Sequence, residues 1–136
     1  MRIIALDFGR RRIGVAISDP SGKVARPLTV IERKNTEFDI QRISELVEEY
    51  DAEEVVVGLP ITLSGKIGPQ AQEVLKYVDE LKKVVKIPIM TWDERLTTAY
   101  ADRFLREAEL RHEKKKRIVD KLAASIILQS YIDSKR

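Results

Sequence analysis

The chain of 136 residues contains no cysteine, a single histidine and a single tryptophan, and aromatic residues make up 6% of it. The absence of cysteine excludes disulfide bonds and thiolate metal sites. Without disulfides, the composition does not point to an oxidising compartment. No apolar run approaches the roughly 20 residues that a membrane-spanning helix needs, and the start MRIIALDFGRRR meets an acid too early for a signal peptide. We therefore expect a cytoplasmic protein without a membrane partner.

What the chain does have is the composition of a folded globular protein. Hydrophobic residues make up 43% and charged residues 35%, and the length suits a single domain spanning residues 1–136. The net charge of +3 is mildly basic, but the basic residues cluster, in an arginine run at 10–12 and in RHEKKKR at 111–117. Such runs usually form solvated faces, and a phosphate backbone is the alternative partner.

The first third of the chain predicts an antiparallel meander. Residues 2–8 and 12–19 have the apolar composition of two strands, joined by a tight turn in which we expect Gly9 to adopt a positive φ. A third strand follows at about 24–33. Pro27 lies inside it and cannot donate to a central ladder, so this strand is predicted at a sheet edge.

From residue 36 onward the pattern alternates between helical and strand periods. A capping box at Thr36–Asp39 starts one helix, Pro69 suits the first turn of a second, and Thr97 or Thr98 caps a third. The segments EEVVVGLP and VKIPIMTW predict buried strands, and the run from residue 118 to about 131 predicts a deeply buried last helix. The order β-β-β-α-β-α-β-α-α predicts an α/β fold, with the late strands parallel to the first and helices on both faces of the sheet.

Acidic residues stand where two of the parallel strands end. Asp7 ends the first strand, and Asp93 and Glu94 follow the last one, whereas the strand between them ends in Gly58 and a proline turn that permits a close approach. Ligands gather at the carboxyl ends of parallel strands in such sheets. Asp7 is therefore either a simple turn residue or one part of a site.

A further acid, Asp120, lies in IVDKLAASIIL, near the start of the predicted last helix. Helical spacing puts it on one face with Ala123, Ala124 and Ile127, and small alanines allow a helix to pack close to a sheet. A buried carboxylate must be compensated, either by a lysine or arginine or by a metal ion.

Three converging carboxylates repel one another unless a cation lies between them. Mg²⁺ and Mn²⁺ prefer oxygen ligands, and two such ions about 3.5–4 Å apart activate water for phosphodiester cleavage. This chemistry needs no nucleophilic side chain, which suits a chain whose one histidine, His112, lies in a polar stretch typical of a surface. We therefore expect Asp7, Glu94 and Asp120 to be catalytic metal ligands.

Four ordered motifs resemble the YqgF family of bacterial proteins, described as pre-16S rRNA nucleases or Holliday-junction-resolvase-like proteins. They are ALDFGRRRIGVAISD, VVVGLPITLSGKIGPQA, DERLTT and VDKLAASIILQSYI, and together they extend over essentially the whole chain. The resemblance implies a ribonuclease-H-like fold with five strands in the order 3-2-1-4-5, strand 2 antiparallel. It also implies an acidic site at Asp7, Glu94 and Asp120. Relatives with this fold often carry four acids, and Asp93 is the candidate for the missing one.

Several basic and aromatic residues near this site have two interpretations. Arg10, Arg11 and Arg12 directly follow the turn after Asp7, and the resemblance favours contacts with nucleic acid. Lys66, in the loop LPITLSGKIGPQ, either follows a phosphate backbone or belongs to a simple connection. Trp92 either stacks on a base or packs in the core.

Three hypotheses of function follow. The first is a hydrolase, a metal-dependent endonuclease leaving a 5′-phosphate, and the resemblance implies processing of the 5′ end of pre-16S rRNA or resolution of branched DNA. The second is an actin-like or sugar-kinase-like phosphotransferase, which the length disfavours because that architecture needs two such domains. The third is a non-catalytic ribosome-assembly or nucleic-acid-binding factor. No sequence feature specifies a dimer surface, so we expect a monomer or a weak homodimer.

Overall fold

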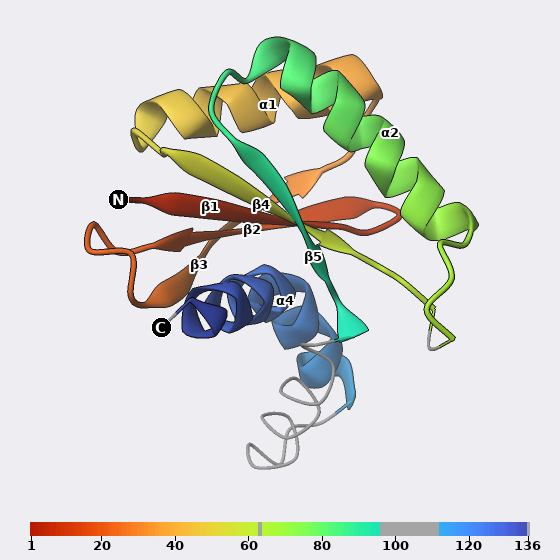
Figure 1. The fold of residues 1–136 in the computed structure, drawn as a ribbon. Helices are drawn as coiled ribbons and strands as arrows, with labels where there is room; N and C mark the ends of the chain where they lie inside the picture. The colour runs from red at the N-terminus through yellow and green to blue at the C-terminus, as the bar shows by residue number, and fades with distance from the viewer. Residues whose placement is uncertain (63, 96–111, 136) are drawn as a thin grey trace.

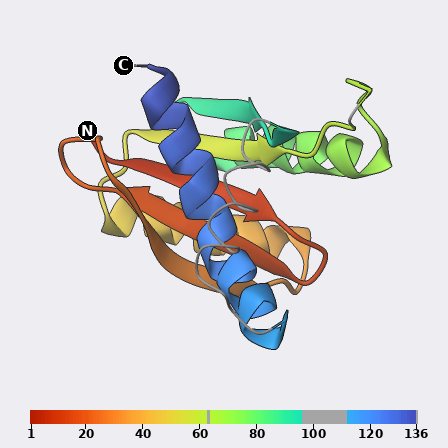
Figure 2. The same cartoon turned by 90° about the horizontal axis from the view of Figure 1, so that it is seen from below.

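A computed structural model describes residues 1–62, 64–95 and 112–135, and the side chains of 112–121 lie outside that description. The described part contains one five-stranded sheet in the order β3-β2-β1-β4-β5, with α1 and α2 on one face and α4 on the other (Figures 1 and 2). The strands are β1 (Ile3–Phe8), β2 (Arg12–Ser18), β3 (Ala25–Glu32), β4 (Glu54–Leu59) and β5 (Ile89–Asp93), and the helices are α1 (Thr36–Glu49), α2 (Pro69–Val84) and α4 (His112–Ser134).

The predicted α/β fold is confirmed. Strand β2 pairs antiparallel with both β1 and β3, whereas β4 runs parallel to β1 and to β5. The predicted helix that begins at Thr97 or Thr98 lies outside the described residues. No helix in the described part of the chain has the length and apolar content to cross a membrane.

Two separate apolar clusters form on the two faces of the sheet. Ile4, Leu6 and Phe8 of β1 join the cluster with α1 and α2, whereas Ile3 and Ala5 join the smaller cluster with α4. Because side chains alternate along a strand, this division places the next residue, the acid at position 7, on the α4 face. The face that holds the acid is therefore the one covered by α4.

The N-terminal meander agrees with the sequence except at Gly9. Pro27 lies in β3, which is an edge strand as predicted, and it pairs with Ala16 beside a register shift. The positive φ expected at Gly9 is wrong, since the described glycines with positive φ are Gly22 and Gly65. Gly9 is needed for space instead, because a Cβ there would lie 2.9 Å from the carbonyl oxygen of Arg12.

Three other details of the predicted elements are also wrong. Helix α1 is capped by Asn35, whose side chain accepts a hydrogen bond from the Phe38 amide at 2.8 Å, so Thr36 is already helical. Strand β5 is partly exposed rather than buried, with Met90 46% exposed, because it is the edge strand beyond β4. The part of α4 whose side chains are described buries one face rather than its whole circumference, and that face packs on the sheet.

Candidate active site

The structure brings two of the predicted acids into direct contact. Asp7 lies at the carboxyl end of β1, and Glu94 follows β5, where its amide donates to the Leu59 carbonyl at 3.0 Å. The two side chains are hydrogen-bonded to each other. Two parallel strands, β1 and β5, which lie on either side of β4, thus place two acids at the same sheet edge, as the order of the elements predicts.

This contact changes the acidity of Glu94. Its pKa is raised from 4.5 to about 8, first because burial penalises the charged form, then because of the hydrogen bond with Asp7, and finally because of the negative charges of Asp7 and Asp93. Near neutral pH the pair therefore holds a proton between its two carboxyl groups. A divalent cation would favour the same oxygens in their ionised form and would compete with that proton.

Gly58 of β4 gives Glu94 the space it occupies. A Cβ at this position would lie 2.6 Å from Cδ1 of Ile127 in α4 and 3.1 Å from Cγ and Oε1 of Glu94. The sequence suggested that this glycine permits a close approach, and the group that approaches is Glu94 itself, together with the helix above it. Any larger residue would push the acid or the helix away from the sheet.

Asp93 is engaged elsewhere. Its Oδ2 lies 2.6 Å from Nη2 of Arg95, and its Oδ1 accepts the Arg95 amide at 2.9 Å. The hydrogen bond from the Arg95 side chain holds the pKa of Asp93 below its ordinary value. This pairing occupies the carboxylate, so Asp93 is a poorer ligand candidate than its neighbour. Sequence reasoning did not single out Arg95, whose one signal is its position directly after two acids.

The third predicted acid, Asp120, belongs to α4 but lies among the residues whose side chains are outside the described part. It precedes the fully buried Ala124 by one helical turn. His112 has the same status, and Thr97 and Thr98 lie outside the described residues altogether. Among the residues whose side chains are described, no group of three histidine, cysteine or acidic residues forms a metal cluster.

The basic residues predicted to contact nucleic acid lie at the same sheet edge. Arg10 and Arg11 are exposed in the β1–β2 hairpin, whereas Arg12 pairs with Glu32 at 2.9 Å across two strands. Lys66 is exposed in the connection after β4, where its amide donates to Oγ1 of Thr62 at 3.1 Å. The hairpin and this connection follow β1 and β4, so their cations lie toward the sheet edge that carries the acidic pair.

Trp92 packs in the smaller apolar cluster. Its Nε1 donates to Oγ of Ser130 at 3.3 Å, and its ring meets that of Tyr131 edge-on at a centroid distance of 5.5 Å. The core-packing interpretation of Trp92 is therefore the one that the structure supports.

The five-stranded sheet and the helices on its two faces define a ribonuclease-H-like fold. RuvC of Thermus thermophilus, solved in complex with a Holliday junction substrate, has a similar fold, with a TM-score of 0.65 over 99% of this chain and 96% of that chain, at 14% identity. The chain belongs to the RuvX family, described as Holliday junction resolvase, whose model matches residues 1–134. The predicted resemblance to the YqgF family is thereby confirmed.

Close relatives carry a more specific name. The protein "Putative pre-16S rRNA nuclease" of Desulforudis audaxviator (strain MP104C) is 49% identical over 136 residues, covering all of this chain and 96% of that protein. A protein of the same name from Caldanaerobacter subterraneus subsp. tengcongensis is 50% identical over 137 residues, covering all of this chain and 99% of that protein. Such full-length matches run against the phosphotransferase hypothesis.

Proposed function

We propose that this protein is a divalent-metal-dependent endonuclease that hydrolyses phosphodiester bonds in structured nucleic acid. The observation that carries the proposal is the hydrogen-bonded pair of Asp7 and Glu94 at the ends of β1 and β5, on either side of β4, with the pKa of Glu94 raised to about 8. Two carboxyl groups in this contact cannot both ionise without a cation nearby. Membership of a resolvase family and the nuclease name of close relatives support the same chemistry.

Asp7, Glu94 and Asp120 are the residues that would hold Mg²⁺ or Mn²⁺. Their carboxylate oxygens are the hard donors that these ions prefer, and the shared proton of the described pair leaves when a cation binds. When bound, the ion supplies Lewis-acid activation of water and stabilises the charge that develops on the phosphate. Gly58 leaves room for Glu94 beside the sheet, and Arg95 keeps Asp93 out of the ligand set.

The basic residues at the sheet edge would hold the substrate. Arg10, Arg11 and Lys66 are exposed toward the same sheet edge as the acidic pair, and phosphate contacts from such residues fix the position of a nucleic acid without reading its sequence. Arg12 would contribute only by leaving its exposed partner Glu32. We propose that the protein works in the cytoplasm.

We propose precursor 16S rRNA, cut near its 5′ end, as the substrate, on the strength of the name that close relatives carry. The second candidate is branched DNA, because the family is described as Holliday junction resolvase. Resolution of a junction needs two related cuts and therefore a dimer, whereas RNA processing is compatible with a monomer or a weak homodimer.

Cleavage of two labelled substrates tests this proposal. A precursor rRNA fragment and a four-way DNA junction are each incubated with Mg²⁺, Mn²⁺ or EDTA and with wild-type protein, Asp7→Asn or the exposed-surface control Asp79→Asn. We expect metal-dependent cutting of the RNA, lost in Asp7→Asn and kept in Asp79→Asn. Preferred cutting of the junction would select the second candidate. Binding without cutting by the wild type would contradict the nuclease and favour an assembly factor.

A further inference from the structure

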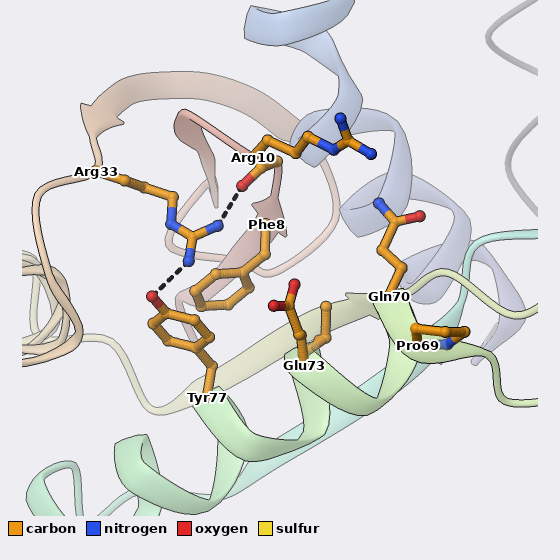
Figure 3. Close-up of a pocket in the computed structure, with 9 residues that line it drawn as sticks. Phe8, Arg10, Arg33, Pro69, Gln70, Glu73 and Tyr77 are labelled. Carbon is orange, nitrogen blue, oxygen red and sulfur yellow. Dashed lines mark hydrogen bonds between the residues drawn. The ribbon is translucent and has the colours of Figure 1, made fainter.

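A second concave site lies on the opposite side of the same sheet edge. A cleft of about 430 Å³ opens between the β1–β2 hairpin and the first turns of α2 (Figure 3). Its volume falls within the range of roughly 300–1,000 Å³ that is typical of small-molecule sites. The side chains that matter for its chemistry are Phe8, Arg10, Arg33, Gln70, Glu73 and Tyr77.

The inner wall of the cleft is held in place by Arg33. Its Nη1 donates to the Gly9 carbonyl at 2.5 Å, its Nη2 donates to the Tyr77 hydroxyl, and its guanidinium lies 4.7 Å from the centroid of the Tyr77 ring. Phe8 and Tyr77 pack with their ring centroids 4.9 Å apart. The hairpin is thus tied to α2 across a wall in which the buried Phe8 ring packs against the half-buried Tyr77 ring.

The mouth of the cleft carries three polar side chains of different chemistry. Gln70 and Glu73 rise from α2 toward the hairpin, and Arg10 reaches over the opening from the other side (Figure 3). All three are exposed, and no hydrogen bond or ion pair within the described part of the chain engages any of their side chains. A cation, an amide and a carboxylate are therefore available to one ligand.

The cleft and the acidic pair are both formed in part by the end of β1 and the hairpin that follows it. Asp7 points to the α4 face and its neighbour Phe8 to the opposite face, so the hairpin that follows them forms a rim between the two sites. A nucleic-acid strand with a phosphate at the acidic pair can cross this rim and continue into the cleft.

We propose that this cleft binds one unpaired nucleotide of the substrate strand, next to the phosphate that is cut; the inference rests on the proposed nuclease function. Arg10 pairs with the phosphate of that nucleotide, and its base lies against the exposed part of the half-buried Tyr77 side chain. The Glu73 carboxylate accepts hydrogen bonds from the amino group on the base edge. Because a paired base hides that edge, the nucleotide must be in a loop, a bulge or a splayed end.

The acceptor-only chemistry of Glu73 predicts which bases fit. Adenine, cytosine and guanine carry exocyclic amino donors, whereas uracil and thymine have none. Their one edge donor, N3–H, stands between two carbonyl oxygens that a carboxylate repels. The cleft therefore discriminates against uridine at this position.

Binding of fluorescein-labelled RNA hexamers of A, C or U to the full chain in EDTA, followed by anisotropy, tests the proposal. We expect the wild type to bind the A and C hexamers roughly tenfold more tightly than the U hexamer. Glu73→Ala should remove this preference, and Arg10→Ala should weaken all three complexes alike and lower the salt slope by about 1. The matched control is Glu80→Ala, on the same helix but paired with Lys83, which should change nothing.

The outcomes separate this inference from the proposed function when cleavage is measured in parallel. If Asp7→Asn abolishes cutting but Glu73→Ala keeps the wild-type base preference, the cleft proposal is wrong and the nuclease stands. If the wild type shows the base preference lost in Glu73→Ala but cuts nothing, the cleft stands and the nuclease is wrong. Equal binding of all hexamers by the wild type would overturn the cleft proposal.

Discussion

At the scale of single residues, folding brings two carboxyl groups into contact, and a bound cation would reduce the repulsion between their ionised forms. The fold holds Asp7 and Glu94 within hydrogen-bonding contact, and the pKa of Glu94 rises to about 8 while its ordinary value is 4.5. Between these two values the folded protein binds more protons than the unfolded chain. The contribution of Glu94 to the free energy of unfolding therefore falls as pH rises from about 4.5 to 8.

This linkage predicts a specific loss of stability. In urea unfolding without metal, the free energy of unfolding should decline by on the order of 2 kcal/mol between pH 5 and pH 8. This is less than the full pKa shift of Glu94 would give, because the side chain is partly exposed to solvent. Glu94→Gln has no carboxyl to titrate and should flatten this part of the profile. An unchanged decline in Glu94→Gln would show that other groups cause it.

Gly58→Ala tests whether space beside the sheet matters. The new Cβ would clash with Cδ1 of Ile127 and crowd Glu94, so we expect a loss of about 1–3 kcal/mol in urea unfolding and a loss of cleavage. Ile127→Val removes that Cδ1, so the double variant should recover stability while cleavage stays low, because Glu94 is still displaced. Full recovery of cleavage in the double variant would contradict the role given to Gly58.

At the scale of elements, Arg33 links three parts of the fold. It joins the β1–β2 hairpin to α2, and its Nε lies 3.6 Å from Oδ2 of Asp39, a carboxylate that α1 buries almost completely. That oxygen has no hydrogen-bond partner within the described residues. The ion pair is therefore the main compensation for a buried charge.

Arg33→Ala should lower the free energy of unfolding by about 3 kcal/mol, because it leaves the Asp39 carboxylate buried without a cation. Adding Asp39→Asn should restore part of the loss, as a double-mutant cycle in urea measures. The control Arg42→Ala, which breaks an exposed pair with Glu45, should change stability by less than about 1 kcal/mol. Equal effects of Arg33→Ala and Arg42→Ala would disprove the linking role.

Element identity follows from local patterns, whereas burial depends on neighbours. Strand and helix periods predict the described elements and their order, and Pro27 correctly marks an edge strand. The same patterns overstate the burial of β5, because an apolar run does not reveal that a strand lies at an edge. The Asn35 cap is missed because two adjacent residues, Asn35 and Thr36, are both good caps, and only backbone geometry decides between them.

The candidate site is predictable to the extent that strand ends define it. The positions of Asp7 and Glu94 at the ends of parallel strands predict that both belong to one site, and the two side chains are in contact. The pairing of Asp93 with Arg95 could not be found this way, because spacing alone does not say which of two adjacent acids faces the site. The cleft around Arg33 and Tyr77 has no sequence motif that would predict it. Its lining residues come from three separate parts of the chain: the hairpin, α2, and the segment after β3.

At the scale of the whole molecule, the two faces of the sheet pack against different helices. Helix α4 covers the face with the acidic pair, and α1 and α2 build the core of the other face (Figure 2). The acidic pair and the cleft both lie toward the edge where β1, β4 and β5 end. A strand of nucleic acid laid across this edge would meet the acidic pair and the basic residues together.

Calorimetric titration of Mn²⁺ into the protein at pH 7, repeated in buffers of different ionisation enthalpy, tests the central claim most directly. If the acidic pair holds the metal, binding should release about one proton, because the pKa of Glu94 is about 8 before the cation enters. Glu94→Gln should bind more weakly and release none. Mn²⁺ binding without proton release, or no binding at all, would contradict the account.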